Sequence, residues 1–161
     1  MNLLSSLVGA AQRVISALES AQPLAQLAAR LYVGQAFFLS GLTKIRSWDT
    51  TLALFADEYQ VPLLPPHVAA VLGTAGELVL PVLLALGLAG RFAAAGLFVV
   101  NAVAVASLME IAPAALQQHV FWGSLLVGLV LWGPGRLSLD RWIAPRLQGA
   151  RPSHAGYTRA A

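Results

Sequence analysis

The sequence predicts an all-α integral membrane protein, a four-helix bundle with an N-terminal amphipathic interfacial helix and a short periplasmic helix. Composition points to a membrane, because 58% of the 161 residues are apolar, only 11% are charged, and the mean hydropathy is +0.72. In addition, four apolar stretches are each long enough to cross a hydrocarbon core of about 30 Å, which takes roughly 20 helical residues.

The four predicted membrane spans cover residues 24–44, 67–88, 92–110 and 114–132. Proline or glycine stands at each boundary, where these residues start or stop helices. The boundary residues are Pro23, Pro65, Pro66, Gly90, Pro113, Gly133, Pro134 and Gly135. This pattern predicts four helices joined by short connections, except that the connection over residues 45–66 is long.

Residues 1–22 are predicted to form a separate helix. Apolar residues recur at helical spacing from Leu3 to Leu18, and the opposite face carries Ser16, Arg13 and Glu19. This pattern is typical of a helix that lies in the membrane interface. The alternative is a soluble helix that docks on the bundle.

The long connection between the first two spans carries an aromatic and aliphatic stripe. Trp48, Leu52, Phe55 and Tyr59 recur at helical spacing. We expect a short amphipathic helix that covers the outer end of the bundle, and such stripes serve packing more often than ligand binding. The final segment, 143–161, is rich in Gly, Pro, Ser and Arg, and is predicted to be a disordered tail.

Charge asymmetry predicts the orientation. Arginines gather on one side of the predicted bundle, at Arg13, Arg91, Arg136, Arg141 and Arg146. The other side has Lys44 and Arg46 among three acidic residues. The positive-inside rule then places both termini in the cytoplasm. The chain divides into an interfacial helix (1–22), a bundle (23–142) and an Arg-rich cytoplasmic tail (143–161).

Composition also excludes some functions. The chain has no cysteine, so a disulfide, a thiol relay or a cysteine-ligated metal is impossible. The sparse arginines form no basic face interleaved with aromatic residues, so nucleic acid is not an expected partner. The expected partner is the lipid bilayer, and any redox role needs a cofactor or a second protein.

Three spans bring polar side chains to one depth. At a rise of roughly 1.5 Å per residue, Gln35, Glu77 and Asn101 lie near the midplane, and Arg30 lies nearer the inner boundary. A carboxylate in hydrocarbon needs a partner or a proton, so we expect Arg30 to reach toward Glu77. The pair could bind a ligand, or it could serve only to fix the register of two helices.

Pro81 adds an acceptor at the same depth. Because proline has no N–H, the carbonyl four residues earlier loses its helical hydrogen bond, and that carbonyl belongs to Glu77. In a membrane, such a group is satisfied by a neighbouring helix, a water or a ligand. Position 77 therefore offers a carboxylate together with a spare backbone acceptor.

A second constellation lies at the outer mouth of the predicted bundle. It consists of Lys44, Glu110, His119 and Trp122. His119 could accept a proton or bind a polar head group. His67, Met109 and Glu110 lie on the same side but lack ligand spacing on one helix, so we assign no metal site, and haem is unsupported.

Three segments resemble the DoxX family of small four-helix membrane proteins. They are "LAARLYVGQAFFLSGLTKI" (27–45), "GELVLPVLLALGLAGRFAA" (76–94) and "WGPGRLSLDRW" (132–142). Family-like positions are Arg30, Gly34, Phe38, Gly41, Lys44 and Glu77. The resemblance implies a bacterial inner-membrane protein, related to proteins linked to sulfur-compound oxidation, oxidative-stress complexes and metal-responsive operons. Some relatives have cysteines, which this chain lacks.

The first functional hypothesis is a membrane subunit of a redox or oxidative/metal-stress defence system. In it, Glu77, paired with Arg30 and supported by Gln35 and Asn101, binds or exchanges protons with a quinone-like ligand. No catalytic residue is assigned; an enzymatic role would be that of an oxidoreductase subunit. The alternatives are a non-catalytic scaffold that recruits soluble enzymes and a small transporter or metal-handling protein. In each case we expect a homo-oligomer.

Overall fold

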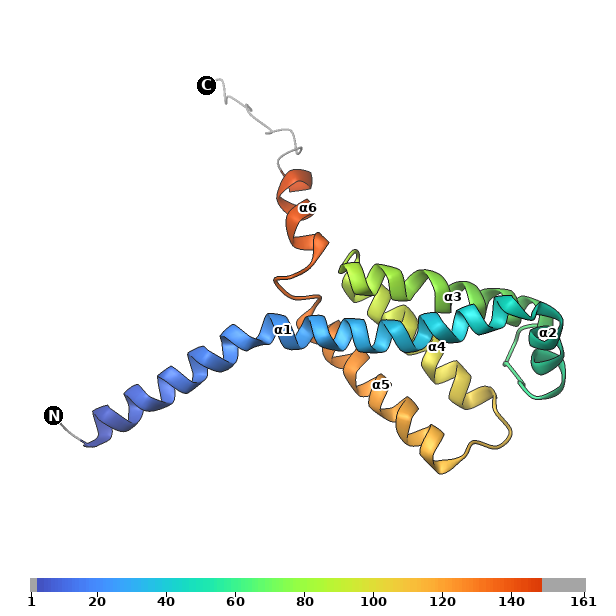
Figure 1. Ribbon diagram of the computed structural model, residues 1–161, viewed down its shortest axis with the longest axis horizontal. Helices are drawn as coiled ribbons and strands as arrows, with labels where there is room; N and C mark the ends of the chain where they lie inside the picture. The colour runs from blue at the N-terminus through green and yellow to red at the C-terminus, as the bar shows by residue number, and fades with distance from the viewer. Residues whose placement is uncertain (1–2, 149–161) are drawn as a thin grey trace, which may run out of the picture.

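The computed structural model describes residues 3–148, and the side chains of residues 6–143. This part of the chain is all-α and contains no strand, as predicted (Figure 1). The helices are α1 (Leu3–Arg46), α2 (Trp48–Asp57), α3 (Pro66–Leu86), α4 (Gly90–Ser107), α5 (Pro113–Trp132) and α6 (Leu139–Gln148). We call the end of the bundle that carries α2 the outer end, and the end with the α3–α4 turn the inner end.

Helices α3, α4 and α5 are long and apolar enough to cross a membrane, and confirm three of the four predicted spans. The protein is therefore a multi-pass membrane protein. Residues 24–44 of α1 do not reach the same hydropathy, since Arg30, Gln35 and Lys44 interrupt them. This part of α1 nevertheless packs against α3 and α5, so a fourth span here remains an expectation.

Helix α1 continues through the boundary expected at Pro23. It runs unbroken from Leu3 to Arg46 with Pro23 inside it, so the predicted separate helix 1–22 is wrong as to its end. Proline costs the helix one hydrogen bond, but the flanking Ala, Gln and Leu residues are strong helix formers. The N-terminal half of α1 projects beyond the bundle, with most described side chains exposed (Figure 1).

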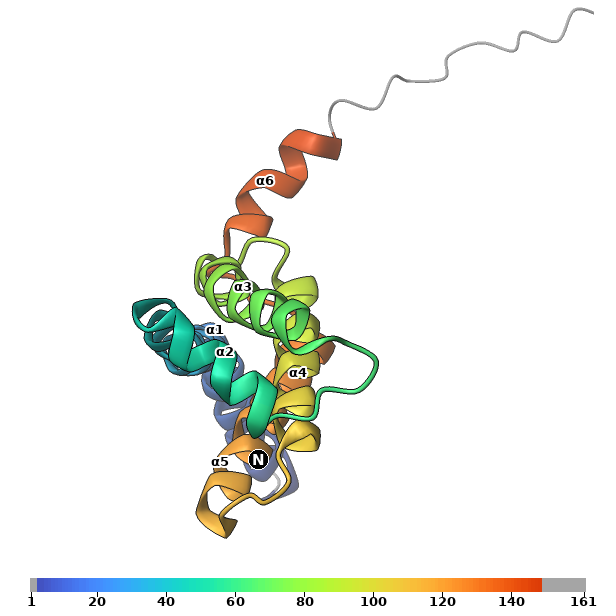
Figure 2. The same cartoon turned by 90° about the vertical axis from the view of Figure 1, so that its right-hand side faces the viewer.

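Helix α2 and the connection after it close the outer end of the bundle. The expected stripe packs: Phe55 is buried with Ala69 and Ala70 of α3, and Trp48, Leu52, Tyr59 and Val61 lie around them. The backbone N–H of Gln60 donates to the carbonyl of Ser107 at 2.8 Å, which ties this connection to the end of α4. In Figure 2 α2 lies across the end of the bundle.

The bundle core lies between α1, α3, α4 and α5. Its buried apolar residues are Val33, Phe37, Leu84, Ala93, Ala94, Leu97, Leu126 and Leu129. Glycines on α1 allow α3 to approach closely, as the sequence predicts. A Cβ at Gly34 would lie 3.3 Å from the carbonyl oxygen of Pro81, and one at Gly41 would lie 2.9 Å from the side chain of Leu78.

At the inner end, the segment after α5 folds back onto the α3–α4 turn. Asp140 accepts hydrogen bonds from the backbone N–H groups of Ala89 (2.7 Å) and Gly90 (2.8 Å), and so caps α4. Helix α6 then extends to Gln148, so the disordered tail predicted from residue 143 is wrong for residues 143–148. The rest of that tail, 149–161, lies outside the described residues.

The α3–α4 turn depends on Gly87, which has φ +66°. We expect Gly87→Ala to lower the melting temperature, because alanine costs about 1–2 kcal/mol in the left-handed region. The Cβ of the new alanine would also overlap the Nη1 atom of Arg30 and would lie 2.5 Å from the Cβ of Ser138. Thermal unfolding in detergent tests this, with Gly9→Ala as the control, since a Cβ at Gly9 meets nothing within 4 Å. Equal melting temperatures for the two variants would show that the turn is not constrained in this way.

Candidate functional site

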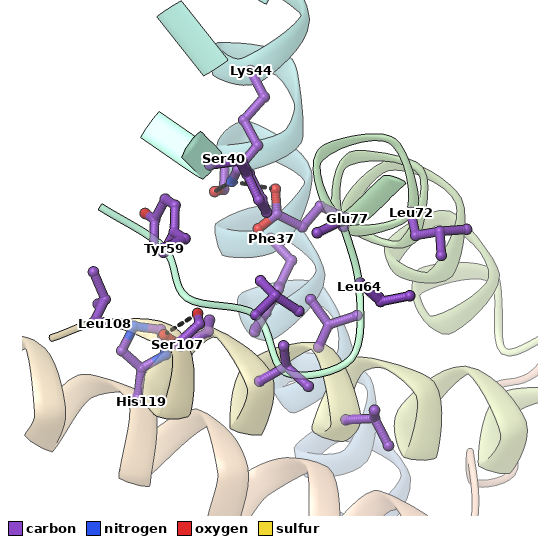
Figure 3. Close-up of a pocket in the computed structure, with 18 of the residues that line it drawn as sticks. Phe37, Ser40, Lys44, Tyr59, Leu64, Leu72, Glu77, Ser107, Leu108 and His119 are labelled. Atoms are coloured by element: carbon purple, nitrogen blue, oxygen red, sulfur yellow. Dashed lines mark hydrogen bonds and ion pairs between the residues drawn. The ribbon is translucent and has the colours of Figure 1, made fainter. Parts of the chain in front are cut away.

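A cavity of about 390 Å³ lies near the outer end, between α1, α3, α4 and α5 and beneath α2 (Figure 3). We call it the outer cavity. Most of its lining is apolar, including Phe37, Leu72 and Val100. The side chains with polar atoms that line it are Ser40, Lys44, Tyr59, Glu77, Ser107, His119 and Trp122. Its volume and its few polar groups are typical of small-molecule sites.

Glu77 is paired with Lys44 in this cavity. Lys44 Nζ lies 2.6 Å from Glu77 Oε2 and also donates to Ser40 Oγ at 3.0 Å. The side chains of Lys44 and Glu77 are only 18% and 10% exposed. Among the side chains described, this is the one ion pair, and no hydrogen bond reaches the second carboxylate oxygen, Oε1.

The predicted pair between Arg30 and Glu77 is therefore wrong. The 14 residues from Arg30 to Lys44 span roughly 21 Å of helix axis, so Arg30 lies at the inner end instead. There its guanidinium is completely buried and donates from Nη2 to the carbonyl of Leu137. Arg30 thus holds the segment after α5 against the bundle, and plays no part in the outer cavity.

His119 is held by Asn101 from the neighbouring helix α4. Asn101 Nδ2 donates to the backbone carbonyl of His119 at 3.0 Å, which fixes the amide with Oδ1 toward the ring. His119 Nδ1 lies 2.8 Å from that Oδ1. Since a carbonyl oxygen only accepts, Nδ1 must carry the hydrogen, and in the neutral ring Nε2 is then left as an acceptor. Asn101 orients His119 and does not line the outer cavity.

Trp122 packs beside His119 on α5. The two rings meet edge to face with centroids 5.2 Å apart, and Trp122 also contacts the ring of Phe37. The indole Nε1 is buried and has no hydrogen-bond partner among the described residues. An unpaired buried donor costs stability, so Trp122 contributes its ring, and not a hydrogen bond, to the wall of the cavity.

The structure thus brings Glu77, Lys44, His119 and Trp122 to one cavity, and leaves four predicted residues outside it: Arg30, Asn101, Gln35 and Glu110. Gln35 is exposed on the surface of α1 and does not face the cavity. Glu110 is exposed in the connection after α4, because α4 ends at Ser107 and not at residue 110. The described residues contain no group of three or more His, Asp or Glu that could hold a metal ion.

Sequence reasoning missed Ser40, Ser107 and the polar role of Tyr59. Ser40 stands one helical turn before Lys44, a spacing that could have indicated the contact. Tyr59 was considered only as part of the aromatic stripe, for which packing was preferred to ligand binding. Burial, and then the negative charges of Glu77 and Glu58, raise the pKa of Tyr59 above its usual value, so its hydroxyl stays protonated and can donate at neutral pH.

The sequence model of the DoxX family matches residues 25–110, which is more than half of the chain. The chain belongs to the DoxX family. Within this DoxX protein, the matched segment includes Lys44, Tyr59, Glu77 and Asn101, but ends before α5. The 132–142 segment, whose sequence also resembles the family, lies outside the match. Comparisons with curated proteins and with solved structures found no match.

Proposed function

We propose that this DoxX family membrane protein binds a quinone-like ligand in the outer cavity, as the membrane subunit of a redox or stress-defence system. The observation that carries the proposal is the Lys44–Glu77 pair, which faces an apolar cavity of about 390 Å³ instead of being sealed by packing. The arginine distribution favours an orientation with both termini in the cytoplasm, and the protein is proposed to be a homo-oligomer.

The polar groups of the outer cavity match both redox states of such a ligand. A quinone presents carbonyl oxygens, which need donors, and Lys44 Nζ and the Tyr59 hydroxyl are donors. A quinol presents hydroxyl groups, which need acceptors. Glu77 Oε1 and His119 Nε2 are acceptors without another partner among the described residues. In Figure 3 Glu77 and His119 lie on different sides of the cavity. This separation suits a quinol, whose two hydroxyl groups lie on opposite edges of the ring.

The same acceptors can take protons. A quinol that is oxidised releases two protons with its two electrons, and Glu77 and His119 are positioned to receive them. The electrons must pass to an acceptor outside this chain, because the sequence has no cysteine for a thiol relay or an iron–sulfur cluster. For this reason the proposed role is that of a subunit that works with a redox partner.

Glu77→Gln tests the proposal. It replaces a charged acceptor by a neutral one, so we expect about tenfold weaker binding of a short-chain benzoquinol, corresponding to about 1.4 kcal/mol. Binding of the oxidised benzoquinone should change less, since its carbonyls need donors. Equilibrium dialysis under nitrogen, with each redox form and the purified protein in detergent, measures both affinities.

The matched control is Glu58→Gln, which removes the same charge from an exposed residue that does not line the cavity. It should leave both affinities as in the unmodified protein. If Glu77→Gln binds quinol as well as the unmodified protein does, Glu77 is not a ligand contact and the proposed site is wrong.

A further inference from the structure

A second cavity, of about 460 Å³, lies at the inner end of the bundle, and we call it the inner cavity. It is bordered by α1 near Gln22 and Gln26, by the segment after α5, and by the start of α4. Three arginines line it: Arg91, Arg136 and Arg141. The distribution of arginines predicts that this end faces the cytoplasm.

The charges of these arginines are only partly balanced within the cavity. Among the described side chains, none of the three lies within ion-pairing distance of a carboxylate. Asp140 lines the same cavity, but its two oxygens already accept hydrogen bonds from the backbone of Ala89 and Gly90. Glu19 is the one other acidic residue in the lining. The lining thus carries three positive and two negative charges, and among the described side chains no arginine in it is paired with a carboxylate.

The backbone that carries Arg136 is held in place. Arg30 anchors it through the carbonyl of Leu137, and Ser138 Oγ donates to the carbonyl of Gly135 at 2.8 Å. Gly133 and Gly135 have φ of +82° and +84°, and a Cβ at Gly135 would overlap the side chain of Gln26. The segment is thus packed tightly against α1, which keeps the arginine at the cavity.

We propose that the inner cavity binds the phosphate group of an anionic phospholipid. Guanidinium groups pair with phosphate through two parallel hydrogen bonds, and basic pockets beside membrane helices on the cytoplasmic side suit anionic head groups. Trp132 and Trp142, which are 71% and 70% exposed, stand close by in sequence, as aromatic residues at a membrane surface do. This position favours a lipid over free phosphate as the source. The site is independent of the quinone proposal.

Native mass spectrometry of the purified full-length protein tests the site, with phosphatidylglycerol, phosphatidylcholine and inorganic phosphate as probes. We expect a single phosphatidylglycerol to remain bound per chain, at least about tenfold more tightly than phosphatidylcholine. Inorganic phosphate should not displace it. Arg136→Gln combined with Arg141→Gln should weaken phosphatidylglycerol binding by at least about tenfold.

The matched control is Arg13→Gln combined with Arg46→Gln, which removes the same charge from exposed residues outside the cavity, and it should bind as the unmodified protein does. If the glutamine pair fails to fold, Arg136→Lys with Arg141→Lys keeps the charge without the paired geometry, and should weaken binding by a smaller factor. Equal binding of both phospholipids, displacement by inorganic phosphate, or unchanged binding in both cavity variants would each overturn the proposal.

Discussion

Replacing Lys44 by methionine should destabilise the protein by about 3 kcal/mol, at the lower end of the range for breaking a buried ion pair. The variant leaves Glu77 without its partner at a position where only 10% of the side chain is exposed. Replacing both residues, as Lys44→Met with Glu77→Leu, should destabilise less than Lys44→Met alone, because an apolar pair leaves no unpaired charge. Equilibrium unfolding in detergent measures both free energies.

The matched control for this cycle is Arg46→Met. Arg46 is also near the end of α1, but it is exposed and outside the outer cavity, so its loss should change the unfolding free energy by less than about 0.5 kcal/mol. If Lys44→Met is as stable as the unmodified protein, or if the double variant is less stable than the single one, the pair does not stabilise the fold in this way.

Filling the outer cavity should weaken ligand binding more than any single polar substitution. Ala104 lines the cavity from α4, so Ala104→Phe places a ring in the space proposed for the ligand. Overpacking costs about 1–3 kcal/mol, and a ligand whose binding bears this cost binds roughly 5- to 150-fold more weakly. Titration with a short-chain benzoquinone, followed by quenching of tryptophan fluorescence, measures the affinity.

Ala95→Phe serves as the matched control, since Ala95 is on the same helix but exposed and away from the cavity. It adds the same ring to the surface and should leave the affinity unchanged. Equal quenching in Ala104→Phe and Ala95→Phe would mean that the quinone partitions into the detergent or binds elsewhere.

The sequence was sufficient to find Glu77 but not its partner. An intramembrane carboxylate can be recognised without a structure because its desolvation is costly. Which cation reaches it depends on how far α1 is shifted along α3, and this shift follows from the close packing of Gly41 against Leu78. The depth of a residue, estimated from the predicted ends of its span, does not reveal such a shift. For this reason Arg30, and not Lys44, was predicted to be the partner of Glu77.

Helix boundaries were predicted less well than helix positions, for local reasons. Pro23 was expected to end a helix, yet the helix formers around it carry α1 through. Residues 143–148 looked like a polar tail, whereas α6 starts at Leu139 beside the cap that Asp140 gives to α4. The orientation of His119 could not be predicted at all, because it depends on hydrogen bonds between two helices.

The presence of a ring ligand in the outer cavity is tested most directly by mass spectrometry of the small molecules extracted from protein purified out of its native membrane. The unmodified protein should carry a quinone or a quinol in near-stoichiometric amount, and Ala104→Phe should carry little or none. Phospholipid alone in both samples, or a co-purified second polypeptide without any ring compound, would contradict the quinone proposal and favour the scaffold alternative.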